Sequence, residues 1–172
     1  FPFKAQAETV TWTIASTMAG NEVVYDRFLT DVIDTVKERT NGQFIIKLKK
    51  SGEVIENNGI FNSIRFGMVD GAVMSAQTWG NANLSFAFVG DITGDWKDTN
   101  HARKWYDEYG HDFLQRVYER YNMRTLGYAA RPYESLVSTF PIEGAADLKG
   151  KVMRTPPGMA HDLFVRLGVI PR

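Results

Sequence analysis

Hydrophobic and polar residues alternate between two periods over the first half of the chain. Three short stretches are rich in β-branched or aromatic residues and favour strands: 9–15, 43–49 and 71–75. Between them, apolar residues recur at helical spacing, first from Val24 to Val36 and then from Ile60 to Met68. The first of these helices is expected to end at Asn41-Gly42, since this pair favours a left-handed stop. Strands that alternate with helices predict a parallel sheet in an α/β fold.

The second half predicts a further set of elements. The range 79–98 has no clear period, so we expect an irregular loop with one short helix. Aromatic and aliphatic residues four apart predict a helix over 100–121. The remaining expected elements are strands over 123–129 and 134–139, a helical turn at 147–150, a strand over 151–154 and a helix over 156–167.

Composition and charge limit the classes of function. The 172 residues contain 20 Lys plus Arg and 20 Asp plus Glu, so the formal net charge is zero and no nucleic-acid partner is expected. The absence of cysteine excludes disulfides and thiolate metal sites. No apolar run approaches the roughly 18 residues that span a bilayer. The GxSxG, HExxH, GxxxxGK[ST] and GxGxxG motifs are also absent, which makes a familiar hydrolase, kinase or dehydrogenase less expected.

No cofactor or metal ion is expected from the spacing of the titratable residues. His101 and His111 stand ten residues apart on one predicted helix, which does not bring them together. A loop with acidic residues at 91, 95 and 98 lacks the order of a calcium-binding loop, so solvated aspartates are the simpler interpretation. His161 and Asp162 are helix neighbours and point in different directions.

Arg154 is the strongest candidate for a binding residue. It follows a predicted buried strand and precedes Thr155-Pro156-Pro157, which opens a predicted helix. A guanidinium beside a helix N-terminus favours an anion, although pairing with an interior carboxylate explains the position equally well. Arg131, in the turn between two predicted strands, either reaches the same crevice or lies on the surface.

The order of several short motifs resembles that of TRAP transporter solute-binding proteins. The resemblance runs from Thr9 over nearly the whole chain, and its strongest part is the DLKG stretch followed by a strand that ends in Arg. The motifs that carry it are Thr40-Asn41-Gly42, Ser51-Gly52-Glu53, Gly67-Met68-Val69-Asp70-Gly71-Ala72, Pro141-Ile142, the run from Asp147 to Pro156, and Leu167-Gly168-Val169-Ile170-Pro171.

This resemblance implies a two-lobed α/β architecture like that of periplasmic binding proteins. We expect residues 9–125 to form the first lobe and residues 126–172 part of the second, with residues 1–8 as the remnant of a trimmed export signal or tag. Family members are about twice the length of a usual domain of about 100 to 150 residues, whereas this sequence has 172 residues. We therefore expect this chain to be either a fragment of a longer receptor or one part that a separate chain completes.

The function that the resemblance implies is a periplasmic receptor and not an enzyme. Such a receptor closes on a small organic acid and delivers the acid to a membrane permease. Arg154 matches the arginine that forms a salt bridge with the ligand carboxylate, and Arg131 stands slightly upstream of a second ligand-facing arginine. Further ligand contacts are assigned by position to Ser16, Thr17, Asn57, Ser75 and Gln77, and Trp79 is expected to contact the rest of the ligand as an aromatic side chain.

Two other interpretations stay open at this stage. An α/β enzyme would use the same crevice for acid–base chemistry, with His161 or Glu134 as the base. A structural or interaction domain would pair its arginines internally. The identity of the acid is also open among C4-dicarboxylates, 2-oxo acids, sugar acids, aromatic acids and sialic acid.

Overall fold

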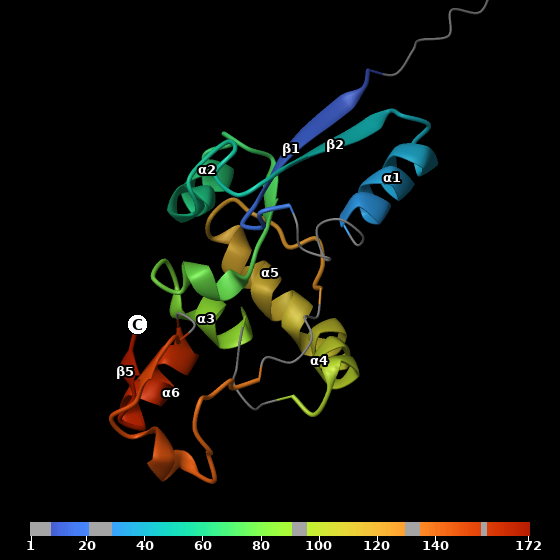
Figure 1. Cartoon of the computed structure of the whole chain (residues 1–172). Helices are drawn as coiled ribbons and strands as arrows, with labels where there is room; N and C mark the ends of the chain where they lie inside the picture. Colours follow the sequence, from blue (N-terminus) through green and yellow to red (C-terminus); the bar gives the residue numbers. More distant parts are fainter. Residues whose placement is uncertain (1–7, 21–28, 91–95, 130–134, 156–157) are drawn as a thin grey trace, which may run out of the picture. The chain divides into compact units, whose positions relative to one another are not determined.

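The computed structural model describes residues 8–20, 29–90, 96–129, 135–155 and 158–172 (Figure 1). The chain divides into two compact units, Phe1–Met74 and Ser75–Arg172, which are described separately. These units differ from the lobes expected from the resemblance, which meet after residue 125. The assignment of lobes therefore stays a prediction. In the described ranges, no helix has the length and apolar character needed to cross a membrane.

The first unit is built on a three-stranded parallel sheet with the order β2-β1-β3. The strands are β1 (Val10–Ser16), β2 (Phe44–Lys49) and β3 (Gly71–Val73). Ile14 pairs with Leu48 on one side and with Gly71 on the other. A side chain at Gly71 would crowd the Ile14 side chain, because a β-carbon there would lie 3.0 Å from Ile14 Cδ1. The parallel sheet predicted from the pattern is therefore confirmed.

Helices α1 (Thr30–Arg39) and α2 (Ile60–Arg65) connect these strands, with the 3-10 turn η2 (Asn57–Gly59) before α2. Helix α1 packs along β2 (Figure 1). It ends at the predicted position, since Asn41 and Gly42 adopt φ angles of 49° and 74° and the Gly42 amide donates to Lys37 O at 2.8 Å. The predicted start after Asn21 lies outside the described residues.

The second unit is mostly helical. Its elements are η3 (Ala76–Trp79), α3 (Leu84–Gly90), α4 (Thr99–Trp105), η4 (Tyr106–Gly110), α5 (His111–Glu119), η5 (Ala145–Leu148), β4 (Val152–Met153), α6 (Met159–Arg166) and β5 (Ile170–Pro171). An aromatic cluster joins η3, α3 and α5. Phe86 is fully buried, with its ring 5.8 Å from that of Trp79 and 4.9 Å from that of Tyr118. Burial also raises the pKa of Tyr118 far above its ordinary value, so its hydroxyl stays protonated.

The helix predicted over 100–121 is interrupted by a π-helical turn. Helix α4 continues into η4 and then into α5 without leaving the helical conformation. The Trp105 ring lies against Gly110 so closely that a β-carbon there would be 2.5 Å from the ring. The indole therefore occupies space that only glycine leaves open, and the wider turn accommodates it.

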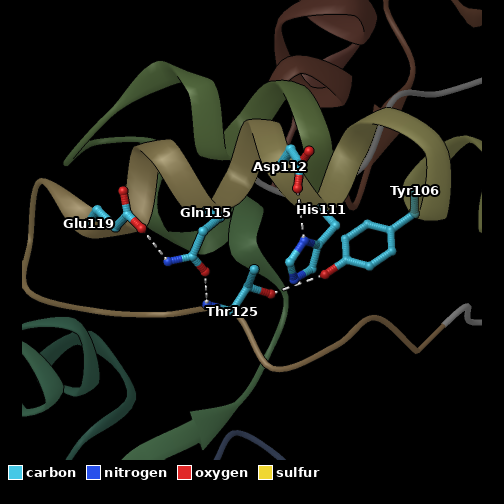
Figure 2. Close-up of polar contacts among 6 residues, drawn as sticks. All are labelled: Tyr106, His111, Asp112, Gln115, Glu119 and Thr125. Atoms are coloured by element: carbon cyan, nitrogen blue, oxygen red, sulfur yellow. Dashed lines mark hydrogen bonds and ion pairs between the residues drawn. The ribbon is translucent and has the colours of Figure 1, made fainter.

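The segment after α5 is held to the helix by side chains (Figure 2). The Tyr106 hydroxyl lies 3.0 Å from Thr125 Oγ1, and the Thr125 amide donates to Gln115 Oε1 at 3.2 Å. Gln115 Nε2 donates in turn to Glu119 Oε1 at 2.9 Å. The Tyr128 ring stacks on Tyr106 with centroids 4.7 Å apart. These contacts hold the segment without strand pairing.

Two predicted strands are therefore wrong. Residues 123–129 and 135–139 contain no strand, and residue 134 lies outside the described part. A strand requires a neighbouring backbone as well as suitable residues. Leu126 is 79 % exposed and Val137 is 96 % exposed, so these two apolar residues face no packed neighbour in the described ranges.

The end of the chain forms a small β-α-β unit, of which the first strand and the helix were predicted and the strand β5 was not. Strands β4 and β5 are parallel, with Val152 opposite Ile170 and Met153 opposite Pro171. Helix α6 joins them, and its buried face packs with η5 and β5. The shared core consists of Leu148, Phe164 and Val169 with Met153 and Leu167.

Candidate functional site

Arg154 directly follows β4 and is exposed. The strand is held at this end because the Arg172 amide donates to Met153 O at 3.0 Å. In the described ranges, no Asp or Glu carboxylate lies within salt-bridge distance of the Arg154 guanidinium. The alternative in which this arginine pairs with an interior carboxylate therefore finds no partner among these residues.

Helix α6 begins beside Arg154. Gly158 precedes the helix with φ of 96°, and no side chain caps the helix N-terminus. Thr155 Oγ1 lies 2.9 Å from Nδ1 of His161, in the first turn of α6. This contact places the exit of β4 against the start of the helix. The Thr155–His161 pair was not predictable from the sequence, since the two residues stand six positions apart, a spacing that no regular element favours.

Gln77 comes to the same end of α6 from η3. A β-carbon at Gly158 would lie 4.0 Å from Gln77 Cβ and 3.8 Å from Ala87 Cβ, so η3 and α3 flank the helix start. Gln77 Oε1 is buried and has no hydrogen-bond partner among the described residues. A buried acceptor without a donor costs about 1 to 3 kcal/mol, which favours a ligand or a water that donates to it. Of the predicted residues, the structure thus brings Gln77 and Arg154 to one helix end.

Ser75 and Trp79 lie at the two ends of η3. The Ser75 carbonyl accepts from the Thr78 amide at 3.2 Å and from Thr78 Oγ1 at 2.8 Å, which starts the turn. The Trp79 ring is buried and packs edge-on against Phe86 and Tyr118. The structure therefore gives Trp79 a packing role, and its contact with a ligand stays a prediction. Arg131, predicted to face the ligand, lies outside the described residues, as does Glu134, the alternative base.

Three predicted residues gather in the first unit, at the carboxyl ends of β1 and β2. Ser16 is buried, and its Oγ accepts from the Met18 amide at 3.0 Å. The Ser51 amide donates to Met18 O at 2.8 Å, and Ser51 Oγ donates to Asn57 Oδ1 at 3.0 Å. Thr17 lies within this loop and is half-buried. The edge of a parallel sheet at which strands end is where α/β folds bind ligands.

The residues considered for metal binding have other contacts. Asp98 caps α4, because its Oδ1 accepts from the His101 amide at 2.7 Å. His111 Nδ1 lies 3.3 Å from the Asp112 carboxylate (Figure 2), and the His111 ring packs edge-on against Tyr106. Within the ranges that the structure describes, no three His, Asp or Glu side chains form a cluster that would hold a metal ion. The residues 91 and 95 lie outside these ranges.

Asp147 organises the turn that leads into β4. Its carboxylate accepts from the amides of Glu143 at 2.9 Å and Gly144 at 3.0 Å. These two hydrogen bonds hold the pKa of Asp147 below the ordinary value of 3.8. The DLKG motif thus begins within the turn η5 and leads directly to β4, the strand that Arg154 follows.

Asp147→Ala is expected to destabilise the chain in a pH-dependent way. Because the pKa of Asp147 is lower in the folded state, its contribution is fully present above pH 3.8 and disappears as the pH falls through the folded value. The free energies of unfolding of wild type and variant should therefore differ at about pH 7, and the difference should shrink progressively as the pH falls below 3.8. Urea unfolding followed by circular dichroism measures this difference. Asp34→Ala, at an exposed site on α1, serves as the control, and a pH-independent difference for Asp147→Ala would contradict the argument.

The described elements define an α/β fold, with polar residues at the ends of parallel strands and an exposed arginine after β4. A model of the DctP family, described as bacterial extracellular solute-binding protein, family 7, matches residues 14–172. The chain belongs to this family, whose members in the TRAP systems are solute-binding receptors. The resemblance found from the sequence motifs is thereby confirmed.

Several solved structures share the fold at low sequence identity. A TRAP periplasmic solute-binding protein from Rhodobacter sphaeroides, in an apo open structure, is 22 % identical, with 94 % of this chain and 51 % of that chain covered and a TM-score of 0.76. A relative from Haemophilus influenzae with bound L-gulonate is 17 % identical, with coverage of 95 % and 54 % and a TM-score of 0.79. DctP6 of Bordetella pertussis, an extracytoplasmic solute receptor binding pyroglutamic acid, is 15 % identical, with coverage of 95 % and 53 % and a TM-score of 0.83.

These matches confirm the α/β class and the architecture of periplasmic binding proteins. The chain spans about half the length of the structures that it matches, as the 51 % and 53 % coverages show.

Proposed function

We propose that this chain forms part of the periplasmic receptor of a TRAP transporter, which captures a small organic acid and delivers it to a membrane permease. The observation that carries the proposal is Arg154, an exposed arginine at the carboxyl end of β4 with no carboxylate partner among the described residues. A guanidinium donates two parallel hydrogen bonds to a carboxylate, so this position suits the acid group of the ligand.

Other residues are proposed to contact the rest of the ligand. Gln77, whose Oε1 lacks a donor, is suited to accept from a hydroxyl or N–H group near the acid. Ser75 lies at the start of the same turn. Ser16, Thr17 and Asn57 are also proposed as polar contacts of the ligand, and Arg131 and Trp79 complete the proposed set.

A ligand screen tests this proposal. The panel consists of succinate, pyruvate, L-gulonate, benzoate and pyroglutamate, which represent different classes of organic acid. We expect at least one acid to raise the melting temperature of the 172-residue chain, because a ligand that binds only the folded state stabilises it. Isothermal titration calorimetry then gives the dissociation constant.

The matched control is a neutral analogue, 2-pyrrolidinone, which keeps the ring of pyroglutamate but lacks the carboxylate. If no acid binds, or if the neutral analogue binds as tightly as pyroglutamate, the proposed function is wrong. NMR spectra of the bound acid after incubation separate a receptor from an enzyme, because a receptor leaves the acid chemically unchanged.

A further inference from the structure

The contact between Thr155 and His161 joins the residue after Arg154 to helix α6. Thr155 Oγ1 and His161 Nδ1 are 2.9 Å apart and partly buried. The geometry suits both neutral tautomers, since the hydroxyl donates to an unprotonated Nδ1 or accepts from a protonated one. Nδ1 is therefore occupied inside the protein in either case.

Arg154 is consequently held from both sides along the chain. On the strand side, Met153 pairs with Pro171 and its carbonyl accepts from the Arg172 amide at 3.0 Å. On the helix side, Thr155 is bonded to the first turn of α6 through His161. Arg154 itself is exposed, so no packing of its own side chain fixes its direction.

We propose that His161, acting through Thr155, is a positioning residue that holds the backbone at Arg154 in the orientation in which its guanidinium receives the carboxylate. The inference rests on the proposed function. Arginine has a long side chain with several rotatable bonds, and ordering this side chain on ligand binding lowers its conformational entropy and so reduces affinity. A fixed backbone on both sides of Arg154 reduces the freedom that ligand binding must remove, which increases affinity without a contact between His161 and the ligand.

Four variants separate this role from a direct contact. Thr155→Val removes the hydroxyl and keeps the shape of the side chain, whereas Thr155→Ser keeps the hydroxyl. His161→Asn places an amide group near the position of Nδ1, and His161→Gln places it near the position of Nε2. The hydrogen bond to Thr155 is therefore kept only in Thr155→Ser and His161→Asn.

Affinity for pyroglutamate, L-gulonate and pyruvate is measured by calorimetry for wild type and all variants. We expect Thr155→Val and His161→Gln to weaken binding about tenfold and the other two to stay within about twofold. The double variant Thr155→Val/His161→Gln should bind about as weakly as either single variant, because both remove the same interaction. If His161→Asn weakens binding and His161→Gln does not, Nε2 contacts the ligand directly and the positioning role is wrong.

A second measurement does not depend on the ligand. NMR relaxation of the ligand-free chain gives the order parameter of the Arg154 backbone amide, which is about 0.85 in rigid backbone and below about 0.6 in flexible backbone. We expect it to fall in Thr155→Val and His161→Gln and to be kept in Thr155→Ser and His161→Asn. An unchanged value in the first two variants overturns the inference. If wild type binds no acid, the proposed function fails, while the order parameters still decide whether His161 holds Arg154.

Discussion

Replacement of Arg154 by alanine is expected to weaken the binding of organic acids by at least about 30-fold and to leave the fold intact. The residue lies at the exit of β4, so its side chain adds little to the core. In the bound state, its loss would leave a carboxylate without its partner. Truncation of one member of a buried, hydrogen-bonded charge pair costs about 2 to 5 kcal/mol, which weakens binding by about 30-fold to several thousandfold.

Two further variants make this result specific. Arg154→Lys keeps the charge but loses the planar fork, so we expect affinity between that of wild type and alanine variant. Arg166→Ala removes another exposed arginine, in the last turn of α6, and should bind the acid like wild type. Calorimetry measures the affinities, and thermal unfolding shows whether each variant is folded. Wild-type affinity in Arg154→Ala would remove the basis for an arginine–carboxylate interaction.

Replacement of Phe86 by alanine is expected to produce the largest loss of stability in the second unit. Phe86 is 0 % exposed and lies between Trp79, Tyr118 and Tyr121, with ring centroids 4.9 to 5.9 Å apart. Its removal leaves a cavity at the contact of η3, α3 and α5, and Phe-to-Ala substitutions in cores cost about 3 to 5 kcal/mol. The same cluster anchors η3, so Gln77 should also lose its fixed position.

The same helix offers a matched control. Phe88 stands two residues further along α3 and is 51 % exposed, so Phe88→Ala should cost well under half as much. Urea unfolding of both variants, followed by circular dichroism and tryptophan fluorescence, gives the two free energies. Equal losses in Phe86→Ala and Phe88→Ala would show that the aromatic cluster is not the core of this unit.

The strands of the parallel sheet and the end of α1 were predictable because they depend on the pattern of apolar and polar residues close together in the sequence. Strands β1, β2 and β3 and the end of α1 lie where the apolar period and the Asn41-Gly42 pair predict them. The order of the motifs was also sufficient to indicate the family. Arg154 could be selected from the sequence because a strand end and a helix start are both local signals.

The predictions that failed depended on neighbours that are distant in the sequence. Suitable residues occur over 123–129, yet this segment is held by Tyr106 and Gln115 instead of a strand. The π-helical turn was missed for another reason: the apolar residues over 100–121 keep the four-residue spacing of an ordinary helix, and this spacing does not show the close approach of the Trp105 ring to Gly110.

For this protein, the sequence by itself determined the strand–helix alternation, the family and the position of Arg154, since each depends on residues close together along the chain. Only the tertiary structure decided that Gln77 lies beside the start of α6 with an acceptor lacking a donor, and that His161 bonds to Thr155. The approach of Gln77 to Gly158 joins parts of the chain about 80 residues apart, and the distance between two side chains across a fold is not encoded in their spacing along the sequence.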